Sequence, residues 1–296
     1  MDNRWRTSLG TPEEEERLPD QPRFTIPAGA VDCHMHVYGP SERYPVAVTS
    51  PSPVPRNSSL SAYREVQARL GLGRTVVVQP TAYGIDNACT LDAVAELGLG
   101  SARAVVAVTP ETSEDELLRL HAAGARGARA FMLGGGPVAW ERLPDLAARV
   151  APHGWHVQLQ FDGGEMLERE RLIQSLPCPV VIDHVGRFHE PVPPDAPSVR
   201  ALLRLLEGGR TWVKLSSPYG VSRSGPPGYA DVSAIARALI ATASDRLVWG
   251  SNWPHPNAPE PKPDEAPLLD LLTEWAPEMT TRQAILVTNP TKLYDF

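Results

Sequence analysis

Cysteine is scarce in this 296-residue chain, and the three that occur, Cys33, Cys89 and Cys178, are widely spaced. A disulfide framework or a cysteine-based zinc site needs paired cysteines at short spacing, so neither is expected. The apolar runs are only of strand length and cannot cross a bilayer. Lysine and arginine form no run, and the formal net charge is −7. Binding to nucleic acid or to a membrane surface is therefore not indicated, and we expect a small-molecule substrate.

The N-terminal segment is also unlike a targeting signal. It has no apolar core and carries four consecutive glutamates. We expect residues 1–26 to form a polar, proline-rich arm on the surface of a cytoplasmic protein. Residues 27–296 are expected to form one domain, because barrel folds of this length are commonly single domains. The sequence gives no indication of the oligomeric state.

Short runs rich in valine and isoleucine alternate with helical segments along this domain. Eight runs occur, at residues 30–37, 75–80, 103–108, 128–133, 156–161, 180–185, 211–216 and 246–252. Several intervening segments begin at a capping residue (Ser59, Asn87 or Ser113) and end in glycine. Eight strand–helix repeats predict an α/β fold, a single (β/α)8 barrel of the TIM type. An open doubly wound sheet is the alternative, although its usual glycine-rich fingerprint is absent after the first run.

The active site of such a barrel lies at the carboxyl ends of its strands, so the polar residues there are candidates. His34 and His36 are two positions apart and leave the same face of an extended strand. Two histidines at this spacing favour function over a structural pair. The sixth run ends in Asp183 and His184. His184 is the better candidate for the barrel mouth, whereas Asp183 would serve equally well as a structural hydrogen-bond acceptor.

Two arginines are candidates for binding an anion. Arg129 lies in an apolar run, and a buried guanidinium needs a carboxylate partner or a polar cavity. Paired with a substrate carboxylate, it would bind in a bidentate manner. Arg187 follows the sixth run and either contacts an anion or faces solvent. Arg126, nearer the start of its strand, is expected to be structural.

The remaining strand ends and loops add further candidates. Lys214 is either a site residue or a buried ion-pair partner, and both interpretations stay open. The last run ends in Asn252, Trp253 and His255, where a proton-transferring carboxylate would be expected. Trp253 is expected to pack, and His121, His153 and His189 are expected to lie away from the site. The other candidates for ligand binding are Tyr83, Gln160, Ser216, Tyr219 and Arg223.

Four of these segments together resemble one branch of the amidohydrolase superfamily. They are DCHMH at 32–36, VVIDHVGR at 180–187, KLSSP at 214–218 and LVWGSNWPHPN at 247–257. The branch is that of 2-pyrone-4,6-dicarboxylate lactonase-like proteins, which includes galactarolactone isomerases. The resemblance runs from about Ala28 to Tyr294. It implies a single distorted (β/α)8 barrel, and an enzyme that hydrolyses or isomerises lactones of sugar acids or carboxylated compounds, typically without a required metal.

Departures from the metal-dependent superfamily pattern bear on the cofactor. Metal-dependent members of the superfamily hold their ions with residues of strands one, four, five, six and eight. Here the fourth strand has no Lys or Glu at its end, the fifth has Gln158 and Gln160, and the eighth has Asn252 in place of Asp. We therefore expect no required metal. A zinc ion, if bound, would use three imidazoles, those of His34, His36 and His184.

Departures from the lactonase bear on the reaction. Arg129 and Arg187 match its motif, but Asn252 stands where it has Asp and Gln160 where it has Tyr. An amide cannot take a proton at neutral pH, but it can orient a hydroxyl, which leaves room for isomerisation. A zinc-dependent hydrolase or decarboxylase and a non-catalytic ligand-binding barrel stay open as alternatives. We expect acid–base and oxyanion roles for His34, His36 and His184, and a hydroxyl-positioning role for Asn252 and His255.

Overall fold

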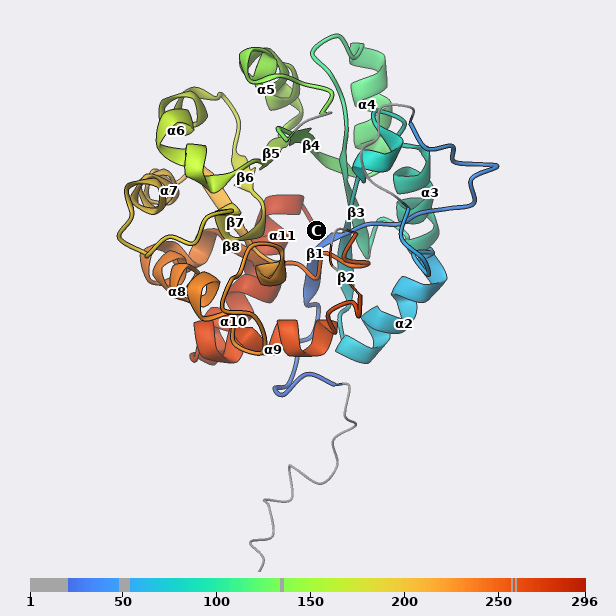
Figure 1. The fold of residues 1–296 in the computed structure, drawn as a ribbon. Helices are drawn as coiled ribbons and strands as arrows, with labels where there is room; N and C mark the ends of the chain where they lie inside the picture. The colour runs from blue at the N-terminus through green and yellow to red at the C-terminus, as the bar shows by residue number, and fades with distance from the viewer. Residues whose placement is uncertain (1–20, 48–53, 134–135, 257, 259) are drawn as a thin grey trace, which may run out of the picture.

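The chain folds into a parallel barrel. The computed structural model describes residues 21–47, 54–133, 136–256, 258 and 260–296. Helices surround the strands, which follow one another in sequence order (Figure 1). This order confirms the predicted (β/α)8 barrel and excludes a doubly wound sheet. The strands are β1 (Val31–Met35), β2 (Arg74–Val78), β3 (Ala102–Val106), β4 (Ala125–Phe131), β5 (His156–Gln160), β6 (Val180–Ile182), β7 (Thr211–Leu215) and β8 (Leu247–Trp249).

Each predicted helical segment forms a helix whose apolar side packs on the barrel. Two predicted caps are confirmed, since Ser59 accepts from the Ala62 amide at 3.3 Å and Ser113 from the Glu116 amide at 3.2 Å. Asn87 does stand at the N-cap of α3, but its side chain makes no capping bond and bonds instead to Ala107 in the loop after β3. The helices are α2 (Leu60–Leu70), α3 (Ala88–Leu97), α4 (Glu114–Ala122), α5 (Leu143–Val150), α6 (Met166–Ser175), α7 (Pro197–Glu207), α8 (Ala230–Ala243), α9 (Glu265–Trp275), α10 (Met279–Gln283) and α11 (Asn289–Tyr294).

The barrel closes between β1 and the segment that follows β8. The amide of Asn252 donates to the His34 carbonyl at 2.7 Å, and the amide of His36 donates to the Trp253 carbonyl at 2.8 Å. Gly250 permits this approach, since a Cβ there would lie 2.6 Å from the His34 Cβ. The predicted strand at 246–252 is therefore shorter than expected, and its last residues form an irregular closure.

The C-terminal helix fills the opposite end of the barrel. Tyr294 of α11 is fully buried and packs with Val31, Cys33 and Val181, which point into the interior. In the view down the barrel, the C-terminus lies near the centre (Figure 1). With this end filled, the carboxyl ends of the strands are left to form the ligand site.

The predicted surface arm is described only from residue 21 onward, and residues 1–20 lie outside the described part of the chain. Ile26 packs against the core, and the Arg282 guanidinium lies 5.2 Å from the centre of the Phe24 ring. Among the described residues, no helix has the length and apolar character needed to cross a membrane.

Candidate active site

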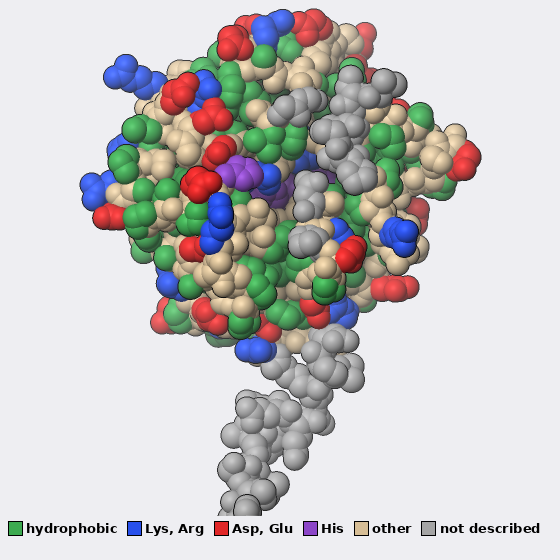
Figure 2. Space-filling model, viewed as in Figure 1, with side chains coloured by type: hydrophobic (Ala, Val, Ile, Leu, Met, Phe, Trp, Pro, Cys, Tyr) green, Lys and Arg blue, Asp and Glu red, His purple; other side chains and the backbone are tan. Residues whose placement is uncertain are grey.

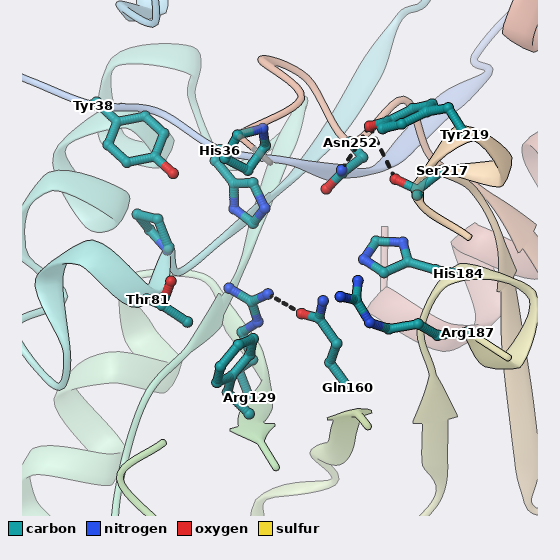
Figure 3. A pocket seen from close by; sticks show the side chains of 14 residues that line it. His36, Tyr38, Thr81, Arg129, Gln160, His184, Arg187, Ser217, Tyr219 and Asn252 are labelled. Carbon is teal, nitrogen blue, oxygen red and sulfur yellow. Dashed lines mark hydrogen bonds between the residues drawn. The ribbon is translucent and has the colours of Figure 1, made fainter. Parts of the chain in front are cut away.

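A cavity of about 180 Å³ opens at the carboxyl ends of the strands. In the space-filling view, histidine and basic side chains lie in a hollow near the centre of this face (Figure 2). Among the described residues, no aspartate or glutamate lines the cavity. The predicted residues that do line it are His36, Gln160, Arg129, His184, Arg187, Tyr219 and Asn252 (Figure 3).

The two histidines of the first strand lie at different depths. His36 lines the cavity, and its Nδ1 lies 2.8 Å from the Val78 carbonyl, which can only accept. His36 Nε2 is therefore an acceptor in the neutral ring, and His34 Nε2 donates to it at 3.3 Å. His34 is fully buried beneath the cavity floor. The structure thus brings the two rings together but leaves only His36 in reach of a ligand.

Lys214 lies directly beneath His34 in the barrel interior. Its ammonium donates to the Cys33 carbonyl at 2.8 Å, to Gln158 Oε1 at 2.7 Å and to His34 Nδ1 at 3.4 Å. Asp183 Oδ1 lies 3.9 Å away. Of the two interpretations left open by the sequence, the structure supports the buried ion-pair partner. Burial lowers the pKa of Lys214 to about 8.

The interior carries a positive electrostatic potential. Burial, with Arg129 adding to it, lowers the pKa of His36 to about 3. Burial and the Lys214 charge lower the pKa of His34 well below its usual value. The imidazoles are thus neutral at physiological pH. Lys214 and the two arginines are three cationic groups near two buried carboxylates, those of Asp183 and Asp32, and Asp32 is already bonded by Ser251 and Tyr63. Such a cavity favours an anionic ligand.

A strained turn carries His184 and Arg187 to the cavity. Strand β6 ends at Ile182, earlier than predicted, and four consecutive residues from His184 to Arg187 all have positive φ, between 49° and 83°. Backbone of this kind is uncommon outside glycine and is found disproportionately at functional sites. The Ser216 hydroxyl lies 2.8 Å from His184 Nδ1. Ser216 itself does not line the cavity, so it holds His184 rather than a ligand.

The two arginines at the cavity differ in how many of their guanidinium donors already make hydrogen bonds within the protein. Arg129 donates through Nη1 to the Gln79 carbonyl and through Nη2 to Gln160 Oε1, the latter at 2.7 Å. The buried Nε of both arginines lacks a hydrogen-bond partner in the described part of the chain, but the Arg187 guanidinium, unlike that of Arg129, makes no hydrogen bond to any described residue. A buried donor without a partner is costly, so Arg187 is the group best prepared to receive a ligand.

Asn252 is held by groups that reach the outer helices. Its Nδ2 donates to the Tyr219 hydroxyl at 2.8 Å, and that hydroxyl lies 2.8 Å from His255 Nδ1. His255 Nε2 lies 3.0 Å from Glu265 Oε1. His255 therefore stands behind the cavity lining, not in it. Glu265 was not among the residues predicted from the sequence. The available signal was an acidic residue directly after the Asp264 cap, ten positions beyond His255.

Some of the remaining residues predicted to bind a ligand do not line the cavity. Tyr83 does not line the cavity; its ring centre lies 5.9 Å from that of Tyr38, which does. Arg223 is exposed and lies 3.4 Å from Glu190, so it is not a lining residue either. Trp253 packs on a tyrosine of α2, as expected. The cavity is also lined by Tyr38, Thr81 and Ser217, which the sequence analysis did not single out.

Three ligand-type side chains cluster in the interior. One atom each from His34, Asp183 and His184 lies within 4.8 Å of the others, which is a possible metal-binding group. The set differs from the three predicted imidazoles, because Asp183 replaces His36. His34 Nδ1 lies 3.4 Å from Asp183 Oδ1 and also 3.4 Å from Lys214 Nζ.

An eight-stranded parallel barrel with one histidine on β1, a second directly after it and a third after β6 defines an amidohydrolase-type enzyme fold. The chain belongs to the amidohydrolase family, whose sequence profile matches residues 31–296. It is 38% identical to D-galactarolactone isomerase of Agrobacterium fabrum, over 92% of this chain and 93% of that one. It is 36% identical to 2-pyrone-4,6-dicarboxylate hydrolase of Comamonas testosteroni, over 93% of each chain.

A solved structure supports the same placement. An apo crystal structure from Agrobacterium tumefaciens is 37% identical, with a TM-score of 0.87 over 93% of this chain and 98% of that one. The predicted lactonase-like branch of the amidohydrolase superfamily is thus confirmed. The expectation of an enzyme of lactone chemistry is confirmed as well, since the named relatives are a lactone isomerase and a lactone hydrolase.

Proposed function

We propose that this protein isomerises the lactone of a polyhydroxylated acid that keeps a free carboxylate. The ester link would move from one hydroxyl of the substrate to another. One observation carries the proposal: Asn252 lines a positively charged cavity in which no described lining residue is acidic. Two relatives support the substrate class, since one is named for a galactarolactone and the other for a pyrone dicarboxylate.

The free carboxylate binds between the two arginines. Arg187 offers unpartnered donors, and Arg129 is held in place by Gln160 on one side. A guanidinium matches a carboxylate in geometry and can bind it through two parallel hydrogen bonds. Thr81 and Ser217 also line the cavity and supply neutral hydrogen-bonding groups for the hydroxyls of the substrate.

The reaction is an internal ester exchange. A substrate hydroxyl attacks the lactone carbonyl carbon, and its proton leaves as the new C–O bond forms. The former ring C–O bond then breaks, and the departing alkoxide takes up one proton. No water is consumed and no net proton is released. The oxyanion that forms in between is stabilised by the positive potential of the cavity.

His184 is the group that transfers the proton. It lines the cavity, and Ser216 fixes its ring. In the free protein burial lowers its pKa well below the usual value, and Arg187 and Arg129 contribute to the lowering. A bound carboxylate offsets these two positive charges and so makes the imidazole more basic when the substrate is present. The attacking hydroxyl has a single proton, which is shared in a three-centre hydrogen bond between Asn252 Oδ1 and the His184 ring before His184 takes it, and this bond orients the hydroxyl.

We further propose that the reaction needs no metal ion. A divalent cation held by His34 and Asp183 would stand about 4 Å or less from the Lys214 ammonium, given the 3.4 Å and 3.9 Å contacts of Lys214 with those two residues. At an effective dielectric constant of 20, unit charges at this distance repel by about 4 kcal/mol, and a divalent ion doubles this. The residues present do not fit a cation, because Lys214 already supplies one.

A panel of lactones followed by NMR tests the proposal. The matched substrates are 1,4- and 1,5-lactones of aldaric acids, which keep a carboxylate, and those of aldonic acids, which do not. We expect ring interconversion of aldarolactones without base uptake, with aldonolactones at least about 100-fold poorer in kcat/KM. Stoichiometric acid release, equal use of both series, or a requirement for added zinc in protein of measured metal content would each contradict it.

A further inference from the structure

A hydrogen-bonded chain runs from the cavity to the outer layer of the barrel. It starts at Asn252 and passes through the Tyr219 hydroxyl and the His255 ring to Glu265 at the start of α9. The second carboxylate oxygen of Glu265 is held by Arg69 of α2. Asn252, His255 and Glu265 are all buried, so the chain is shielded from water over most of its length.

With a neutral His255 ring, the hydrogen bonds of this Asn252–Glu265 chain can run in only one direction. The Glu265 carboxylate is acceptor-only, so His255 Nε2 carries the proton and donates to it at 3.0 Å. His255 Nδ1 is then a bare acceptor, and the Tyr219 hydroxyl, 2.8 Å away, must donate to it. Because the Tyr219 hydroxyl already donates its one proton to His255, it can only accept a hydrogen bond from Asn252. The amide nitrogen of Asn252 must therefore face Tyr219.

The consequence appears at the cavity. With Nδ2 turned to Tyr219, the amide oxygen of Asn252 points toward the middle of the cavity (Figure 3). Ser217 also donates to the Tyr219 hydroxyl, at 3.1 Å. The Tyr219 oxygen therefore donates once and accepts twice within the protein, and it has no lone pair or proton left to bond a substrate. Tyr219 thus positions Asn252 and does not itself react.

We propose that Glu265, through His255 and Tyr219, fixes the orientation of the Asn252 amide so that its oxygen faces the substrate. The two ends of an amide have nearly the same shape, and only the oxygen can accept a hydrogen bond from an attacking hydroxyl. Without the chain, the reversed amide would offer a donor where an acceptor is needed. The effect on catalysis rests on the proposed lactone isomerisation, whereas the orientation of the Asn252 amide and of its hydrogen bonds does not.

The orientation is tested by NMR on the full-length protein with 15N-labelled histidine. We expect His255 in the wild type to be a single neutral tautomer, protonated at Nε2. In Glu265→Gln the new amide can donate as well as accept, so the Nδ1-protonated tautomer should appear beside it. Asp264→Asn is the matched control: it removes the neighbouring carboxylate, which also binds Arg69 at 2.8 Å, without entering the chain. Its His255 signals should match the wild type.

Kinetics with an aldarolactone supply the second measurement. Glu265→Gln and Tyr219→Phe should each lower kcat about 10-fold with KM changed less than about twofold, because orientation is lost while Arg129 and Arg187 still bind the carboxylate. Asp264→Asn should leave both unchanged. A wild-type His255 protonated at Nδ1, or an unaltered tautomer in Glu265→Gln, would overturn the proposal. If no lactone reacts, the NMR result still decides the orientation, so the two failures are distinguishable.

Discussion

Replacement of Arg187 by methionine should affect stability and activity in opposite directions. The side chain is half-buried, its Nε has no partner in the described part of the chain, and burial lowers its pKa. In the free protein this guanidinium is a desolvated cation with an unused donor. Methionine keeps most of the length of the side chain and removes both the charge and the donor. The positive φ of 49° at this position is equally costly for either residue.

The two effects can be estimated separately. An unsatisfied buried donor costs about 1–3 kcal/mol, and partial exposure places Arg187 near the lower end, so Arg187→Met should stabilise the free protein by about 1 kcal/mol. In a chain of this size that raises Tm by about 2 °C. A two-point bond to a carboxylate contributes about 3 kcal/mol, which corresponds to a loss of about 100-fold in kcat/KM.

Thermal unfolding followed by circular dichroism, and kinetics with an aldarolactone, measure the two quantities on one preparation. Arg204→Met is the matched control, because Arg204 is an exposed arginine whose surface pair with Glu170 should be worth less than about 1 kcal/mol. We expect this control to leave kcat/KM unchanged. A lower Tm for Arg187→Met combined with normal kcat/KM would refute the assignment of Arg187 as a prepared carboxylate site.

Three further predictions concern the interior. The pKa of Lys214 is lowered to about 8, so the unfolded chain binds more protons between pH 8 and 10.5, and stability should rise with pH across this window by up to about 3 kcal/mol. Urea unfolding of Lys214→Met should lack that rise, and at pH 8 this variant should be about 3 kcal/mol less stable, since Asp183 loses its partner. An equal rise in both proteins would argue against a buried ammonium. Gly250→Ala should destabilise the barrel by about 2 kcal/mol in the same assay, because the new Cβ would lie 2.6 Å from the His34 Cβ; an unchanged midpoint would contradict the close approach. Prolonged EDTA treatment should leave kcat/KM unchanged, and a loss restored by zinc would contradict the role given to Lys214.

The architecture could be predicted because each strand and helix is encoded locally. All eight valine-rich runs contain strands, and the helical segments between them form helices. Errors cluster where the chain leaves regular structure. The runs at 180–185 and 246–252 end as strands at Ile182 and Trp249, because His184 and Asn252 have positive φ, which side-chain patterns do not encode.

Only the site residues at the carboxyl ends of the strands could be predicted from the sequence. His36, Arg129 and His184 follow from their position in the barrel and do line the cavity. The depth of His34, the contacts of Lys214 and the position of Glu265 depend on packing between segments far apart in the sequence. Lys214 and His34, for example, are 180 positions apart and yet in contact. Tyr38 continues the two-residue alternation of His34 and His36, which was the one local pattern that could have placed it at the cavity.

The fate of water oxygen tests most directly whether Asn252 directs the reaction to isomerisation. The wild type and Asn252→Asp are incubated with an aldarolactone in H2 18O, and the products are resolved by mass spectrometry. The wild type should interconvert the ring forms without incorporating 18O. In Asn252→Asp the carboxylate can activate water, so a larger share of turnover should yield open-chain acid labelled with 18O. Labelled open-chain acid as the main wild-type product, or the same partition in both proteins, would contradict the account.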